Sequence, residues 1–370
     1  MRTAFLSLLI LAGSLFAQQS EPDALFKSAV EAQQRGDNQT AIQDYEQLLK
    51  LRPNLPEARA NLGVALTHEG RFDEAIKQYK IALSSTNDDA IRMNLALAYY
   101  KKDDFESARR EFEEVRKTQP DNVQLAILLG DSDVRLDHAG DAVAILTPLE
   151  AANTGNPDFE YVLGKALIQS GNRRDGAERL ENVADQTHSA DAYFLAGSTL
   201  IDLNEFVRAR TDLETALQLN PNLPRIYSLV GIARDMNGDI TNAEPVLREA
   251  LRRDPDDFDA NVYLGSILYK ERKMEEAKKY LDHALQLQPA SPTARYEIAM
   301  WESTSGNYEE AAKNLEALTK SNPNWLQPHV ELANVYYRLH RPADGAKERA
   351  IVAQLSAQQQ SEGPPKLPQP

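Results

Sequence analysis

The side chains best suited to metal chemistry are scattered along this 370-residue sequence rather than gathered in a motif. No two of its histidines have the i, i+4 spacing that places both imidazoles on one face of a helix, where they could share a metal ion. The six histidines are His68, His138, His188, His283, His329 and His340. We therefore expect each of them to lie on the surface or to pack against neighbours, and we expect no metal site.

The acidic residues do not form a recognisable catalytic or calcium site either. Residues 254–259 read Asp-Pro-Asp-Asp-Phe-Asp, which is similar to the start of a calcium loop. The run lacks the glycine needed at its sixth position, and Gly265 stands where a bidentate glutamate belongs. Adjacent carboxylates such as Glu113 and Glu114 are common, but no pair is distinguished as acid and base. We interpret residues 254–259 as a turn.

Other reaction classes are excluded by missing motifs. The sequence contains no cysteine, which rules out disulfides, thiol catalysis and cysteine metal sites. It also has no phosphate-binding glycine loop, nucleophile elbow or dinucleotide-binding glycine pattern. We therefore predict no catalytic residue and no cofactor, and we do not expect the protein to be an enzyme.

The charge of the chain argues against a nucleic-acid partner. With 41 Lys and Arg against 56 Asp and Glu, the formal net charge is −15. A nucleic-acid binder normally carries a basic stripe that neutralises phosphates, and the sequence has none. The acidic surface is instead expected to keep a long molecule in solution.

The N-terminus has the features of a secretory signal. Arg2 supplies a positive charge, residues 4–16 are uncharged and mostly apolar, and Ala17 offers a small residue before a cut ahead of Gln18. We predict a signal peptide over residues 1–17, a short linker over residues 18–21, and a periplasmic or secreted protein. The alternative is an uncleaved anchor, the one case in which we expect membrane contact. The short signal and absent cysteines favour a bacterial envelope.

Small residues recur along the chain in a fixed register, at steps of 33 or 34 residues. The first small residue of each repeat is, in chain order, Ala29, Gly63, Ala96, Gly130, Gly164, Gly197, Gly231, Gly265, Ala299 and Ala333. Twelve residues after each stands a second small residue, in order Ala41, Ala75, Ala108, Ala142, Gly176, Ala209, Ala243, Ala277, Ala311 and Gly345. A period of this length is typical of a repeat array.

The register predicts pairs of antiparallel helices, because two helices approach most closely where small residues face each other. Four residues after the second small residue, a large apolar side chain can fill the space around that contact. These side chains are Tyr45, Tyr79, Phe112, Leu146, Leu180, Leu213, Leu247, Leu281 and Leu315. Turn residues such as Gly70 and Gly238 separate the two helices, where glycine can adopt the left-handed conformation that closes the first one. Prolines such as Pro120 and Pro255 stop the second helix.

These features closely resemble the tetratricopeptide repeat family. The resemblance covers residues 22–359 as ten repeats, which start at residues 22, 56, 89, 123, 157, 190, 224, 258, 292 and 326. It implies an all-α, right-handed α-solenoid of about ten helical hairpins. Pentatricopeptide repeats, which bind RNA, run one residue longer, so the 34-residue step and the acidic charge argue against them. Residues 360–370 are rich in Pro and Gln, and we expect a disordered tail there.

Two departures from the repeat pattern have structural consequences. Pro148 lies inside the second helix of the fourth repeat, and the junction over residues 153–157 contains both Gly and Pro. We expect a weakened interface there. In the tenth repeat, Arg349 occupies an apolar slot, as expected of a terminal repeat on which nothing stacks.

In the tetratricopeptide family, one wall of each first helix lines an inner groove. Positions three before, one after and four after the first small residue lie together on that wall at 100° per residue. The residues we predict to bind a partner there are Phe26, Met93, Tyr100, Tyr161, Phe194, Tyr269, Tyr296 and Tyr337. The alternative is that these aromatic side chains pack between neighbouring first helices. Some family members grip a carboxylate with Lys, Arg and Asn, but here the wall offers Asn61 and Asn94 without the accompanying Lys and Arg.

The resemblance implies a scaffold that binds a protein or peptide in its groove. For an exported member, this predicts a role in assembling envelope or secretion complexes. The alternative is a regulatory or substrate-presenting subunit of an envelope enzyme.

Overall fold

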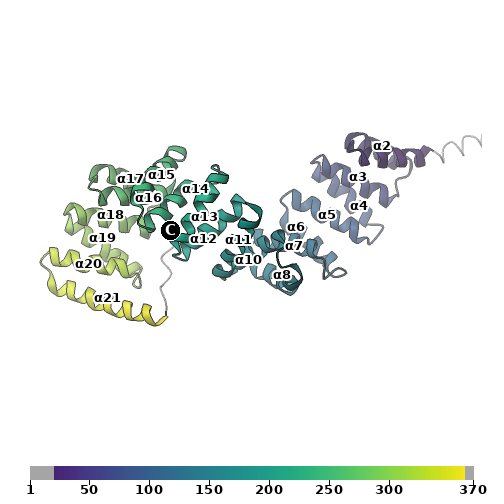
Figure 1. Ribbon diagram of the computed structural model, residues 1–370. Helices are drawn as coiled ribbons and strands as arrows, with labels where there is room; N and C mark the ends of the chain where they lie inside the picture. The colour runs from purple at the N-terminus through teal and green to yellow at the C-terminus, as the bar shows by residue number, and fades with distance from the viewer. Residues whose placement is uncertain (1–20, 363–370) are drawn as a thin grey trace, which may run out of the picture. The chain divides into compact units, whose positions relative to one another are not determined.

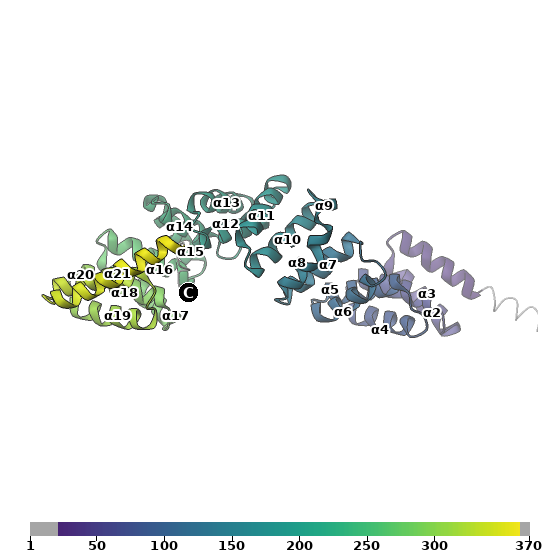
Figure 2. The same ribbon diagram turned by 90° about the horizontal axis from the view of Figure 1, so that it is seen from below.

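The computed structural model describes residues 21–362, with side chains described as far as residue 358, and these residues form consecutive helical hairpins (Figures 1 and 2). The first helices of the ten repeats are residues 21–34, α3 (Pro56–His68), α5 (Asp89–Lys101), α7 (Val123–Arg135), α10 (Pro157–Ser170), α12 (Ala190–Asp202), α14 (Ile226–Met236), α16 (Phe258–Lys270), α18 (Pro292–Ser305) and α20 (Leu326–Arg338). No strand occurs within residues 21–362, so the expected all-α architecture is confirmed.

The second helices follow after short turns. They are α2 (Asn38–Leu51), α4 (Phe72–Leu83), α6 (Phe105–Arg116), α8 (Ala139–Leu146), α11 (Arg173–Thr187), α13 (Phe206–Leu219), α15 (Ile240–Arg253), α17 (Met274–Leu287), α19 (Tyr308–Ser321) and α21 (Pro342–Glu362). Within each unit the second helices pack against their own first helix and against the first helix of the next repeat, for example α4 against α3 and α5, and α17 against α16 and α18. The contacts divide the chain into an N-terminal unit, Met1–Leu180, and a C-terminal unit, Glu181–Pro370.

The small residues allow the two helices of a hairpin to approach closely, as predicted. A Cβ atom added at Gly63 would lie 2.6 Å from the ring of Tyr79, and one added at Gly231 would lie 2.5 Å from Leu247. At Gly176 the added atom would lie 2.6 Å from the backbone oxygen of Gly164, so α10 and α11 meet almost backbone to backbone. The large side chains predicted to surround these contacts are buried.

The turns inside the hairpins share one left-handed residue, which ends the first helix. Glycine takes this conformation in five repeats, with φ between 72° and 102°, as predicted, at Gly36, Gly70, Gly171, Gly238 and Gly306. In the other five repeats the residue with positive φ is Asp103, Asp137, Asn204, Arg272 or His340. The turn geometry is therefore common to all ten repeats, although only half of them supply glycine.

The fourth repeat departs from the others where Pro148 predicts a break. Its second helix, α8, has only 8 residues and continues into a 3₁₀ turn, η1 (Thr147–Leu149), and a short helix, α9 (Glu150–Asn153). Proline lacks the N–H that an α-helix needs, so the regular hydrogen-bond ladder stops at this point.

The predicted signal peptide over residues 1–17 and linker residues 18–20 lie outside the described residues. Glu21 is already helical, and α21 continues three residues past the repeat boundary expected at residue 359. Residues 363–370 of the predicted tail also lie outside the described part. None of the helices within residues 21–362 is long and apolar enough to cross a membrane.

Candidate functional site

All eight residues predicted for the inner wall lie on first helices, four in each unit. Phe26, Met93, Tyr100, Tyr161, Phe194, Tyr296 and Tyr337 are half-buried, whereas Tyr269 is only 4% exposed. First helices of neighbouring repeats contact one another, for example α7 with α10 and α16 with α18. Most of the predicted wall residues therefore keep an exposed part.

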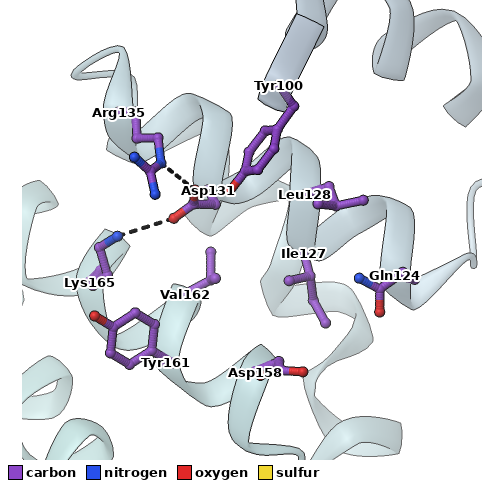
Figure 3. A pocket seen from close by; sticks show the side chains of 10 residues that line it. All are labelled: Tyr100, Gln124, Ile127, Leu128, Asp131, Arg135, Asp158, Tyr161, Val162 and Lys165. Carbon is purple, nitrogen blue, oxygen red and sulfur yellow. Dashed lines mark hydrogen bonds and ion pairs between the residues drawn. The ribbon is translucent and has the colours of Figure 1, made fainter. Parts of the chain in front are cut away.

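Two of these residues, Tyr100 and Tyr161, line the same pocket in the N-terminal unit (Figure 3). The pocket has a volume of about 290 Å³ and lies between α7 and α10, with Tyr100 contributed by α5. Its ten lining residues are Tyr100, Gln124, Ile127, Leu128, Asp131, Arg135, Asp158, Tyr161, Val162 and Lys165. The volume is close to the lower end of the range for ligand sites and suits one large side chain of a peptide.

A buried carboxylate organises the polar end of this pocket. Asp131 is 7% exposed, and three groups from three helices converge on it, as Figure 3 shows. The Tyr100 hydroxyl donates to its Oδ2 at 2.6 Å, Arg135 Nε donates to the same oxygen at 2.5 Å, and Lys165 Nζ donates to Oδ1 at 3.1 Å. The network therefore ties α5, α7 and α10 together beside the pocket.

The charges in this network offset the cost of burying Asp131. Burial alone would raise the pKa of Asp131, but the hydrogen bond from Tyr100 and the charges of Arg135 and Lys165 outweigh burial and lower it. Burial, with the hydrogen bond to Asp131, raises the pKa of Tyr100 to about 12. At neutral pH the carboxylate is thus ionised and the phenol keeps its proton.

The two cations of the pocket also lie against aromatic rings. The Arg135 guanidinium is 4.8 Å from the ring of Phe105, and Lys165 Nζ is 5.4 Å from the ring of Tyr161. Such contacts hold the aliphatic stems along the rings. The Arg135 side chain remains 44% exposed, so part of its guanidinium can still meet a ligand.

The opposite side of the pocket is mostly apolar. Ile127, Leu128 and Val162 face the space between α7 and α10, and Tyr161 borders it (Figure 3). An apolar surface beside fixed donors suits a peptide that inserts one hydrophobic side chain and directs a polar group toward Arg135 and Lys165. The pocket holds no arrangement of nucleophile and base.

The wall of the C-terminal unit has a different character. The Tyr269 hydroxyl donates to Glu297 Oε2 at 3.0 Å, and the Tyr296 ring lies 5.1 Å from that of Trp325. Desolvation raises the pKa of Glu297 above its usual range, although the charge of Lys270 opposes this effect. Tyr269 and Tyr296 are therefore already engaged in contacts within their unit.

Other predicted wall residues also make packing contacts. The ring of Phe26 meets that of Tyr45 edge to face at 6.1 Å, and the Arg349 guanidinium lies 4.5 Å from the ring of Tyr337. Both contacts join a first helix to the second helix of its own repeat. The alternative, packing between neighbouring first helices, is instead represented by the contact of Tyr269 on α16 with Glu297 on α18. Only Tyr100 and Tyr161 among the eight line the pocket.

The sequence pattern identified the tyrosines of the pocket but not its charged residues. Asp131 and Lys165 both occupy the position one after the first small residue, which belongs to the predicted wall. Opposite charges at the same position of neighbouring repeats could therefore have predicted the contact between Asp131 and Lys165. Arg135 lies one residue beyond the last wall position, so the pattern did not include it.

Comparison with known proteins agrees with the hairpins and their register. A family model described as Tetratricopeptide repeat matches residues 26–90, 93–157, 161–224 and 231–292, which together cover more than half of the chain. The chain belongs to the tetratricopeptide repeat family. Tetratricopeptide repeats are typically non-catalytic scaffolds for protein–protein interaction, which is the broad class of function that this family membership supports.

Two relatives of this tetratricopeptide chain share about a quarter of their aligned residues with it. It is 24% identical over 303 residues to the DnaJ homolog subfamily C member 7 homolog of Schizosaccharomyces pombe, covering 80% of this chain and 55% of that protein. It is 24% identical over 282 residues to the Protein CTR9 homolog of Arabidopsis thaliana, covering 70% of this chain and 25% of that one. The chain thus spans between a quarter and about half of these two relatives.

Among solved structures, a tetratricopeptide repeat protein from Parabacteroides merdae is similar, with a TM-score of 0.50 and 16% identity. That comparison covers 66% of this chain and 98% of the other. At this identity the likeness concerns the fold alone.

Proposed function

We propose that this chain is an exported, non-catalytic scaffold that binds a protein or peptide partner on the inner wall of its first helices. The single observation that carries the proposal is the pocket between α7 and α10, where two predicted wall tyrosines border an apolar recess. The signal-like residues 1–17 support export, and a periplasmic or secreted scaffold would serve the assembly of envelope or secretion complexes.

The pocket suits a partner segment with one large apolar side chain. Interface energy concentrates where an anchor side chain fills a desolvated recess, and the surrounding polar groups then select orientation. Here Arg135 and Lys165 stand at one end of the recess, and Asp158 stands near the other (Figure 3). A peptide crossing α7 and α10 would thus meet positive groups on one side of its anchor and a negative group on the other.

Selection of binding peptides from a random library against the purified protein tests this proposal. The affinity of a selected peptide is then measured for wild type, for Tyr161→Ala and for Tyr280→Ala. Tyr280 is a matched control because it is also a half-buried tyrosine but lies on a second helix, α17. We expect Tyr161→Ala to weaken binding by about 1 to 3 kcal/mol, the usual cost of truncating an anchor, and Tyr280→Ala to have no effect.

One result of this experiment would contradict the proposal. If every selected peptide binds Tyr161→Ala as tightly as wild type, the pocket between α7 and α10 is not the binding site. Thermal unfolding of each variant, measured in parallel, separates lost binding from lost folding.

A further inference from the structure

Three potential metal ligands converge at the turn that joins α7 to α8. They are Asp133 near the end of α7, His138 just before α8, and Asp141 in its first turn. One ligand atom from each lies within 4.8 Å of the ligand atoms of the other two. Asp133 stands two residues after Asp131, so the helical repeat of 100° per residue directs it away from the pocket.

Asp133 carries a buried oxygen that nothing in its surroundings satisfies. Its side chain is fully buried, and Arg109 Nε donates to Oδ1 at 2.5 Å. Its Oδ2 is also buried and has no hydrogen-bond partner among the described residues. An unsatisfied buried acceptor destabilises a fold, so this oxygen is better explained by a ligand that binds it than by protein contacts alone.

The charges around this oxygen leave room for a cation. The Arg109 guanidinium also pairs with Asp141 Oδ2 at 3.1 Å and with Glu113 Oε1 at 3.1 Å. One guanidinium thus faces the three acidic groups of Asp133, Asp141 and Glu113, so the acidic groups outnumber the cation. A divalent ion would neutralise them while Arg109 keeps its bonds to the carboxylates.

We propose that Asp133, His138 and Asp141 bind one divalent transition-metal ion of the zinc class. One imidazole nitrogen with two carboxylate oxygens suits zinc, cobalt or nickel, whereas magnesium and calcium prefer oxygen ligands only. His138 and Asp141 are exposed, so their side chains can adjust to the buried Asp133, and water completes the coordination.

The histidine spacing alone predicts no metal site, because only one of the three ligands is a histidine. The relevant pattern is an Asp, a His five residues later and an Asp three residues after that, placed across a hairpin turn. Metal binding there joins the end of α7 to the start of α8. This is the repeat whose second helix breaks at Pro148, so the ion would support the shortest of the second helices.

The test uses the full chain without an affinity tag, freed of metal by a chelator. Zinc binding is measured by calorimetry, and cobalt is used as a visible-absorption probe of the ligand set. We expect one ion per chain, and we expect His138→Ala and Asp141→Asn each to weaken binding by at least about tenfold. His283→Ala is the matched control, because His283 also lies 2.9 Å from a carboxylate oxygen, that of Asp256, but belongs to no such cluster.

Zinc-dependent stabilisation is a second readout, measured for each variant against its own metal-free form. Zinc should raise the melting temperature of wild type and of His283→Ala, and raise it much less for His138→Ala and Asp141→Asn. The proposal is overturned if wild type binds no zinc at about 1 mM free ion, or if His138→Ala binds zinc as tightly as wild type.

Discussion

Tyr161 and Tyr269 are the same residue type on the same kind of helix, yet their surroundings assign them different roles. Tyr161 keeps an exposed part beside the pocket, whereas Tyr269 is buried and its hydroxyl is bonded to Glu297. A side chain that is already buried in the free protein has little surface left to lose to a partner. At the scale of single residues, exposure therefore separates candidate anchors from packing residues.

This contrast yields a prediction for Tyr269. Truncation of a buried aromatic side chain typically costs about 3 to 5 kcal/mol, so Tyr269→Ala should lower the free energy of unfolding of the C-terminal unit by that order. Tyr269→Phe, which removes only the hydroxyl, should cost about 1 kcal/mol. Thermal unfolding measures both effects. Full stability of Tyr269→Ala combined with weaker partner binding would instead mark Tyr269 as an anchor.

The surroundings of Asp212 on α13 predict that the stability of the fold depends on pH. It is 7% exposed, and its Oδ2 has no partner among the described residues. Burial, reinforced by the charge of Glu181 and opposed by Arg208, raises the pKa of Asp212 from 3.8 to about 7. Because the folded pKa exceeds the unfolded one, protonation of Asp212 stabilises the fold. That contribution is complete below about pH 4 and is lost as the pH rises through 7.

Asp212→Asn should remove this dependence. Just below pH 4 wild type and variant should have similar melting temperatures, whereas at pH 8 the variant should be more stable by about 1 to 4 kcal/mol. The measurement is thermal unfolding of both proteins across this range. Equal pH profiles for the two proteins would show that Asp212 is not the titrating group.

At the scale of elements, the turn inside each hairpin contains a residue with a left-handed backbone conformation. In half of the repeats this residue is not glycine. Arg272, between α16 and α17, has a φ of 66°, and the following backbone N–H closes the turn on the oxygen of Leu268 at 2.9 Å. A side chain in this conformation costs about 1 kcal/mol because Cβ crowds the following carbonyl. The hairpin tolerates this cost because packing of its two helices stabilises it.

Arg272→Gly should therefore stabilise the C-terminal unit. Relief of the strained φ is partly offset by the greater freedom of glycine in the unfolded chain, so we expect a net gain of about 0.5 kcal/mol, seen as a rise in melting temperature. Lys270→Gly is the control, because Lys270 is an exposed residue within the helix α16, where glycine costs about 1 kcal/mol and should lower stability. A stabilising effect of Lys270→Gly as well would contradict this account.

The interrupted second helix of the fourth repeat leads us to predict that this part of the array is less stable than the others. Stability in a repeat array depends on nearest-neighbour interfaces, and α8 offers a shorter interface than its counterparts. Hydrogen exchange should therefore show repeats four and five, residues 123–187, opening more readily than repeats seven to nine. Pro148→Ala should restore protection there. Uniform exchange across all ten repeats would refute the idea.

At the scale of the whole molecule, the chain is a run of hairpins in two units that begins after a signal-like segment. If residues 1–17 are a cleaved signal, the mature protein begins near Gln18, because Ala17 provides the small residue that precedes a cut. Mass measurement of the native protein tests this prediction. A membrane-bound product that keeps Met1 would show that the segment is an anchor.

The repeat register could be determined from the sequence alone because a helical hairpin is built from local contacts. The small residues, the turn residues and the stopping prolines all act within one repeat of 33 or 34 residues. Eight of the ten expected starts, from residue 56 onward with the exception of 224, coincide with the first residue of a helix. At 224 the helix α14 begins two residues later, because Arg225 adopts a left-handed φ of 59° after Pro224.

Only the tertiary structure decided which wall residues are open and which polar groups meet. The periodicity places Tyr161 and Tyr269 on one wall, but their exposure depends on the side chains that neighbouring repeats happen to supply. Asp131 meets Tyr100 and Lys165 because those residues lie on adjacent first helices. Asp133, His138 and Asp141 meet because a left-handed turn at Asp137 folds α8 back onto α7. These contacts depend on how side chains on different helices are oriented toward one another. The spacing of residues along the sequence does not carry that information.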